Sequence, residues 1–84
     1  MARFIYFYFN RKSPDKLEPV VPAHVQYWHQ ANLSNYQGGP FAVRTGGLIS
    51  FTAPSRQAAA ALVAQDPFVR ADLIECHWLK EWEL

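Results

Sequence analysis

The side chain best suited to proton chemistry is His24, in the stretch Val20–Trp28. Pro22 favours the first helical position, where its missing N–H is not needed, so His24 is expected in the first turn of a helix. Residues three and four apart share a helix face, which groups His24 with Tyr27 and Trp28. The positive end of the helix dipole disfavours an imidazolium, and a neutral ring can act as a general base. The alternative is a half-buried histidine that only packs and hydrogen-bonds.

Asp66 is the second candidate, and it stands directly before Pro67. An aspartate in that position commonly caps a short helical turn, which is a purely structural role. A capping carboxylate can also point one oxygen at an imidazole, fixing its tautomer and stabilising its charged form. This carboxylate and the helix dipole would act on His24 in opposite directions, and the sequence leaves the balance open.

Five further residues are candidates for binding a substrate. Gly39-Pro40 is either a turn or bulge, or a place where backbone N–H groups approach an anionic oxygen. Tyr27 and Phe68 are expected to form core or cleft wall. Arg70 offers a fork of donors to a substrate carboxylate, or is a solvated surface arginine.

Several kinds of site are disfavoured. His24 and His29 are five residues apart and point about 140° from each other on a helix. His77 lies far along the chain, and the single cysteine, Cys76, supplies no thiolate cluster, so no metal site is expected. There is no glycine-rich phosphate loop and no nucleophile motif, so no cofactor is expected. The lone cysteine fits a reducing cytosol and a cytoplasmic protein.

The bulk composition limits the partners. A net charge of +1 gives no field that would attract nucleic acid or an anionic membrane. No stretch approaches the roughly 20 apolar residues that a membrane span needs. Half of the 84 residues are apolar, which is rich for a chain that can bury only a thin core. Part of that surface is therefore expected in a subunit interface, with residues 1–84 forming a single domain.

The elements that must position these side chains begin with a strand over Arg3–Phe9, which is β-branched and aromatic. Alternation places Ile5, Phe7 and Phe9 on one face and Phe4, Tyr6 and Tyr8 on the other. Both faces are apolar, so both should be covered. Helices can cover one face, and the other needs a ligand cleft or another subunit. A stable monomer is expected to leave Tyr6 and Tyr8 exposed.

The remaining pattern predicts alternating helices and strands. Proline and turn residues make Asn10–Asp15 a loop and break any helical turn before Pro22. Glycines in Arg44–Gly47 are expected to supply positive φ in a hairpin turn. On the last strand, Ile74, Cys76, Trp78 and Trp82 are expected on one face. The predicted elements are helix 22–32, weak strand 36–41, strand 48–52, helix 56–65 capped by Ser55, a short turn 67–72 and strand 73–83.

The order β-α-β-β-α-β predicts an α+β, ferredoxin-like fold: a four-stranded antiparallel sheet with both helices on one face. The helices leave the other face of the sheet bare. Two such sheets packed face to face would cover it.

Three motifs on this pattern resemble the YciI-like proteins: Pro22-Ala23-His24, Gly39-Pro40 and Asp66-Pro67-Phe68-Val69. The resemblance covers nearly the whole chain. It implies a homodimeric α/β barrel of two ferredoxin-like subunits, with further assembly left open, and a cleft beside a histidine and an aspartate that match His24 and Asp66. A few members of that family are implicated in dehalogenation of chlorinated lactone or hydroxyquinone intermediates, so the resemblance implies this reaction as one candidate.

Three functions follow as hypotheses. The first is a cofactor-free lyase, dehalogenase or isomerase in which His24, oriented by Asp66, moves a proton on a small cyclic or aromatic-derived acid. The second is a non-catalytic module for small-ligand binding or assembly, with a structural His24. The third and least favoured is an RNA-binding module, because Ile5–Asn10 faintly resembles the first-strand motif of RNA recognition motifs. However, Gly46–Phe51 lacks the basic residue and most aromatics of the partner motif.

Overall fold

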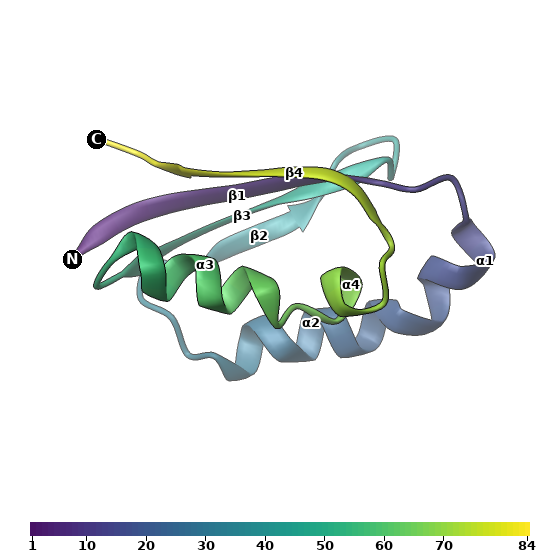
Figure 1. The fold of residues 1–84 in the computed structure, drawn as a ribbon, viewed down its shortest axis with the longest axis horizontal. Helices are drawn as coiled ribbons and strands as arrows, with labels where there is room; N and C mark the ends of the chain where they lie inside the picture. The colour runs from purple at the N-terminus through teal and green to yellow at the C-terminus, as the bar shows by residue number, and fades with distance from the viewer.

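The computed structural model describes all 84 residues as one four-stranded sheet with helices on one side (Figure 1). The strands stand in the order β2-β3-β1-β4, and all neighbours are antiparallel. This is the predicted α+β ferredoxin-like fold. The elements are β1 Ala2–Asn10, α1 Pro14–Leu17, the 3-10 helix η1 Glu18–Val20, α2 Val21–Gln30, β2 Gln37–Pro40, β3 Gly46–Ala53, α3 Arg56–Ala64, α4 Pro67–Arg70 and β4 Ile74–Glu81.

The central strand β1 alternates as predicted. Phe4, Tyr6 and Tyr8 are buried, and they face the layer of helices together with Trp28 of α2. The expectation that a monomer would leave Tyr6 and Tyr8 exposed is therefore wrong, because the helices of the same chain cover this face. The rings of Tyr6 and Tyr8 stack at 5.1 Å, and Tyr6 and Trp28 at 6.0 Å. Aromatic side chains therefore form the core at the point where α2 crosses beneath the sheet.

The hairpin between β2 and β3 corrects one prediction. No glycine has a positive φ; the left-handed residue of this turn is Arg44, at φ 61°. Gly46 and Gly47 instead belong to β3, where they pair with Phe9 and Tyr8. A Cβ on Gly46 would clash with the carbonyl oxygen of Tyr8. These glycines are thus needed for close approach between two strands.

The helical layer starts earlier than predicted. The end of the expected loop Asn10–Asp15 and the residues after it, which were not expected to be helical, form α1 and η1, which lead directly into α2. Pro14, Pro19 and Pro22 each occupy the first or second position of their own helical segment, where proline is tolerated. The prolines therefore divide one continuous helical run instead of preventing it.

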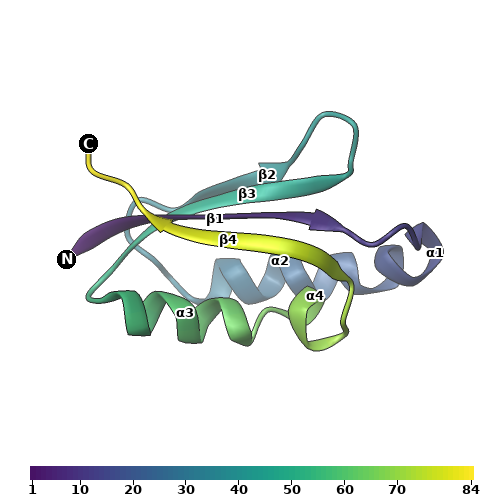
Figure 2. The same ribbon diagram turned by 45° about the horizontal axis from the view of Figure 1, so that its top comes forward.

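The second half of the layer agrees with the sequence. Ser55 caps α3 by accepting a hydrogen bond from Ala58 N at 3.1 Å. Ala59 and Val63 of α3 are buried. Both views place α3 and α4 on the same face of the sheet as α2 (Figures 1 and 2).

The last strand carries one further correction. The register between β1 and β4 shifts after Phe9, so that Cys76 pairs with Phe9 but Ile74 pairs with Asn10. The extra residue, Glu75, lets Ile74 join the core while Cys76 is exposed. Ile74 thus does not share a face with Cys76 and Trp78.

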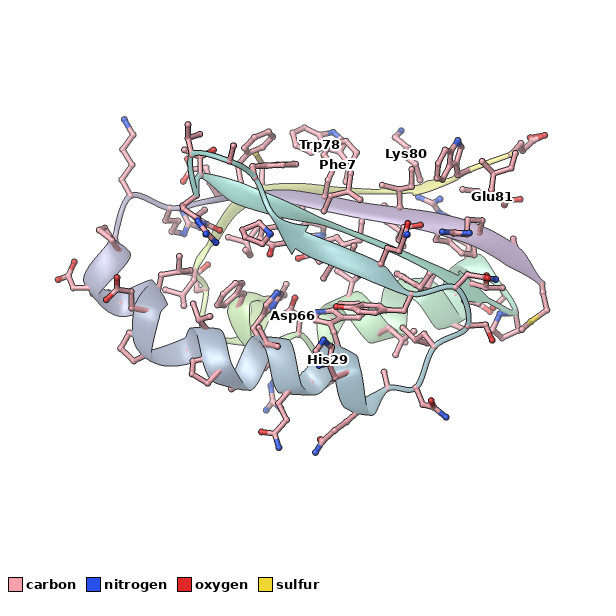
Figure 3. The ribbon with its side chains drawn as sticks, turned by 180° about the vertical axis from the view of Figure 1, so that it is seen from behind. Phe7, His29, Asp66, Trp78, Lys80 and Glu81 are labelled. Atoms are coloured by element: carbon pink, nitrogen blue, oxygen red, sulfur yellow. The ribbon has the colours of Figure 1, made fainter.

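The outer face of the sheet carries apolar side chains. Phe7 and Trp78 stack there at 5.1 Å, and Trp78 is 41% exposed (Figure 3). Lys80 projects from the same face (Figure 3). No helix of the structure is long and apolar enough to cross a membrane.

Candidate functional site

The structure brings His24 and Asp66 into direct contact, although 42 positions separate them in the chain. His24 Nδ1 lies 2.8 Å from Asp66 Oδ1. Asp66 is 0% exposed and His24 is 8% exposed. Figure 3 shows Asp66 in the layer between the sheet and α2. The contact joins the first turns of α2 to the start of α4.

Asp66 also holds the surrounding structure in place. Its Oδ1 accepts a second hydrogen bond from the backbone N–H of Phe68 at 2.9 Å, which caps α4. Its Oδ2 accepts a bond from the indole Nε1 of Trp28 at 3.0 Å. A carboxylate only accepts, so His24 must donate from Nδ1. In the neutral ring, Nε2 is then the unprotonated nitrogen.

Tyr8 is the functional neighbour that sequence reasoning missed. Its hydroxyl lies 3.3 Å from His24 Nε2. The ring of Phe68 stacks on the imidazole at 4.0 Å with an interplanar angle of 8°. Burial, and then the negative charge of Asp66, raise the pKa of the Tyr8 phenol, which therefore keeps its proton. The alternation of β1 grouped Tyr8 with Phe4 and Tyr6, but it did not show that the helices cover this face, and no local signal showed how far the hydroxyl reaches.

A cavity of about 490 Å³ opens beside this cluster. Its lining includes His24, Tyr8, Gly39, Pro40 and Phe68, so three of the five predicted binding residues lie in one place. Asp66 stands behind His24 and is not part of the lining. The cavity thus meets the imidazole and the phenol, while the carboxylate remains buried.

Tyr27 and Arg70, both candidates for binding a substrate, lie outside this cavity. The Tyr27 hydroxyl donates instead to the carbonyl oxygen of Leu62 at 2.6 Å, which ties α2 to α3. Arg70 is exposed in the last turn of α4. Of the two helix residues grouped with His24 by spacing, Trp28 contacts Asp66 and Tyr27 does not line the cavity.

Two charged side chains in the lining were not anticipated. Arg44 reaches the cavity from the β2–β3 turn and Glu18 from η1, and they are the only Lys, Arg, Asp or Glu residues in it. The backbone of Arg44 is held by a bond from its N–H to Phe41 O at 2.9 Å. The left-handed turn that carries Arg44 is a tertiary feature which residue spacing does not reveal. No group of three or more His, Cys, Asp or Glu side chains is placed to hold a metal ion.

A family model for the YCII-related domain matches residues 1–83. The chain belongs to the YCII-related family. This match confirms the resemblance seen in the three sequence motifs. The matched residues include every helix and strand described above. None of the curated proteins matches the sequence closely enough to count as a relative.

Solved structures show the same ferredoxin-like fold. One is 5-chloro-2-hydroxyhydroquinone dehydrochlorinase from Burkholderia phenoliruptrix in complex with 2,5-dihydroxybenzoquinone; it has a TM-score of 0.83 and 22% identity, covering 96% of this chain and 93% of that one. An antibiotic biosynthesis monooxygenase has a TM-score of 0.67 and 16% identity, covering 100% and 98%. A protein from Agrobacterium tumefaciens has a TM-score of 0.52 and 20% identity, covering 99% and 92%.

Proposed function

We propose that the protein is a cofactor-free enzyme of the lyase or dehalogenase type, in which His24 and Asp66 provide acid–base catalysis. The observation that carries the proposal is the position of His24 between a fully buried carboxylate and a cavity. An imidazole that takes up a proton on the cavity side gains a charge partner 2.8 Å away on its other side. The arrangement thus stabilises the state that follows proton removal.

The proposed substrate is a small cyclic or aromatic-derived acid that carries a hydroxyl group and a halogen. In the keto tautomer of such a ring the halogen sits on a tetrahedral carbon. His24 removes a proton from an enolic hydroxyl group, and the electron pair of the broken O–H bond forms a carbonyl. The π electrons displaced by the new carbonyl shift through the ring, and the halogen leaves as halide with the electron pair of its carbon–halogen bond. Apart from the ring itself, only a base is required.

Arg44 and Glu18 set the charge of the cavity. An arginine fork binds carboxylate or enolate oxygens, so we expect Arg44 to hold the ionised edge of the substrate. The variant Arg44→Gln should weaken binding of 2,5-dihydroxybenzoquinone, measured by calorimetry, about tenfold or more, which corresponds to 1.4 kcal/mol. Arg70→Gln, outside the cavity, is the matched control. Equal affinities of the two variants would remove Arg44 from the binding site.

The activity is tested by chloride release from 5-chloro-2-hydroxyhydroquinone, the compound named for the similar dehydrochlorinase. The variant His24→Asn should lower kcat by about 10²- to 10⁴-fold, the usual contribution of a positioned acid–base group. His77→Asn, a change of the same type at an exposed position on β4 outside this cavity, controls for effects on folding. Turnover that survives in His24→Asn would rule out His24 as the base.

A non-catalytic ligand-binding module is the second candidate, and one observation favours it. Both ring nitrogens of His24 already have partners within the protein, Asp66 and Tyr8. A histidine that only holds the cavity wall together would look the same. This candidate predicts that 2,5-dihydroxybenzoquinone binds while no chlorinated or lactone substrate is turned over.

We also propose that the protein is a homodimer whose subunits pack through the outer face of the sheet. Phe7, Trp78 and Trp82 form an apolar strip on that face, and Trp82 also contacts the Arg3 guanidinium, 5.9 Å from its ring. Apolar patches of this kind are uncommon on monomers. Light scattering should give twice the mass of the chain, and Trp78→Lys should give the monomer.

We further propose a cytoplasmic location, because Cys76 has no cysteine with which to form a disulfide.

A further inference from the structure

We propose that the Tyr8 hydroxyl is the group that touches the substrate, and that His24 acts through it as the acceptor at the end of a two-proton relay. The inference deepens the proposed function and rests on it. The relay would be a triad of tyrosine, histidine and aspartate.

The hydrogen-bond directions follow from the buried carboxylate. Asp66 accepts from Nδ1 of His24, so the neutral ring presents an unprotonated Nε2. The Tyr8 hydroxyl, 3.3 Å from that nitrogen, is then the donor. The phenol oxygen keeps its lone pairs for a second partner, and Tyr8 lines the cavity.

The surroundings of His24 leave little other access to Nε2. One face of the imidazole is covered by the parallel ring of Phe68 at 4.0 Å, and the ring of Tyr8 stands at 73° to it with centroids 5.9 Å apart. A ligand in the cavity is therefore expected to contact the phenol oxygen of Tyr8, and not Nε2 of His24 directly.

The proton transfer balances without another reactant. The substrate O–H bond breaks and its proton joins the Tyr8 oxygen, while the O–H bond of Tyr8 breaks and that proton joins Nε2 of His24. Tyr8 ends as a neutral phenol, His24 as an imidazolium facing Asp66, and the substrate as an anion. The raised pKa of Tyr8 favours this concerted course, because a free phenolate never has to form.

Gly47 is a positioning residue for this relay. A Cβ on Gly47 would lie 2.6 Å from the Tyr8 hydroxyl oxygen and 3.0 Å from the carbonyl oxygen of Gly39. Contacts that close do not occur, so a side chain here would move the phenol away from His24. The missing side chain of Gly47 makes room for the hydroxyl.

The kinetic test compares Tyr8→Phe with Tyr27→Phe, which removes a phenol oxygen outside the cavity. With 5-chloro-2-hydroxyhydroquinone, Tyr8→Phe should lower kcat about 10²- to 10⁴-fold with little change in KM, and Tyr27→Phe should not. In H₂O–D₂O mixtures, a plot of the wild-type rate against the fraction of D₂O should be curved, because two protons move. The same plot for Tyr8→Phe should be a straight line. Wild-type kcat, or the same curve, in Tyr8→Phe overturns the relay.

A ground-state measurement separates this inference from the proposed function. In protein labelled with ¹⁵N-histidine, Tyr8→Phe should move the Nε2 resonance of His24 toward that of a ring nitrogen without a hydrogen bond. Gly47→Ala should move it in the same direction, and Tyr27→Phe should leave it in place. An Nε2 resonance unaffected by Tyr8→Phe overturns the inference even if the enzyme is active. Absence of turnover in the wild type together with the expected shifts refutes the proposed reaction but supports the Tyr8–His24 pair.

Discussion

Replacing Asp66 by asparagine should test how the buried carboxylate serves three donors at once. The isosteric amide has one acceptor oxygen and one NH₂ donor, whereas Asp66 accepts from His24, Trp28 and Phe68. With its oxygen in the Oδ1 position, the amide still serves His24 and Phe68. Its NH₂ group then faces the indole N–H of Trp28, which places two donors against each other.

The magnitude follows from this lost bond. A hydrogen bond to a charged group contributes about 1.5–3 kcal/mol, and a buried donor left unpaired costs about 1–3 kcal/mol. Because the two terms overlap, we expect Asp66→Asn to lower the free energy of unfolding by about 3 kcal/mol. For a domain of this size that corresponds to a fall in Tm of about 12–24 °C. The loss is large beside a total stability of about 8 kcal/mol, estimated at about 0.1 kcal/mol per residue.

The assay is a double-mutant cycle with Trp28→Phe, followed by circular dichroism in urea at one protein concentration. Without the indole N–H, the amide at position 66 meets no opposing donor, and Asp66→Asn should then cost only about 1 kcal/mol for two weakened bonds. The expected coupling energy is about 2 kcal/mol. Asp72→Asn is the control, since Asp72 forms only an exposed pair with Arg11, worth below about 1 kcal/mol.

Additivity would refute this reasoning. If the costs of Asp66→Asn in the two backgrounds agree within about 0.5 kcal/mol, the carboxylate and the indole are not coupled. A coupling of the expected size would show that the residue proposed to orient His24 also holds α2 against α4.

Two further predictions concern the aromatic core and the close approach of β1 and β3. Gly46→Ala should lower the free energy of unfolding, measured in urea, by about 2–3 kcal/mol, because the new Cβ clashes with the Tyr8 carbonyl oxygen. Gly39→Ala is the control: nothing lies within 4 Å of its new Cβ, so the free energy of unfolding should change by less than about 0.5 kcal/mol. Similar losses in the two variants would contradict the close contact between β1 and β3. Burial, and then the negative charge of Asp66, raise the pKa of Tyr6, so above about pH 10 the unfolded chain loses this proton while the folded chain keeps it. The free energy of unfolding should therefore fall with rising pH, by up to about 1.4 kcal/mol per pH unit for this residue. In urea unfolding measured from about pH 9 to 11.5, Tyr6→Phe should reduce the slope of the free energy of unfolding against pH by that amount. An unchanged slope would mean that Tyr6 ionises equally in the folded and unfolded states.

The sequence predicted those parts of the fold that depend on local pattern. Alternation in β1, the Ser55 cap and Asp66-Pro67 each specify a structure within a few residues, and each is observed. The helical run from Pro14 to Val20 was missed because proline was taken as a helix breaker, although it is tolerated at the start of a segment. The inward turn of Ile74 was missed because a bulge arises from the pairing of two strands, which one strand's residues do not reveal.

The candidate site was only partly predictable for the same reason. His24 was identified by its place at a helix start and Asp66 by its place before Pro67, and the family motifs contain both of them together with the three lining residues Gly39, Pro40 and Phe68. Tyr8 and Arg44 were not, because their contributions depend on distances across the sheet and on a left-handed turn. Spacing on a helix misplaced Tyr27, whose hydroxyl is bound by α3 instead.

The helix-capping role of Asp66 and its proposed role in orienting His24 do not exclude each other. One oxygen caps α4 and orients His24, and the other holds Trp28, so the same carboxylate supports the core and the site. Loss of activity on changing Asp66 would therefore not separate catalysis from folding. Tyr8 allows the separation, because its hydroxyl has a single protein partner, His24, and phenylalanine keeps the ring that fills the core. The Tyr8 hydroxyl is therefore the atom at which catalysis can be tested apart from the packing of the core.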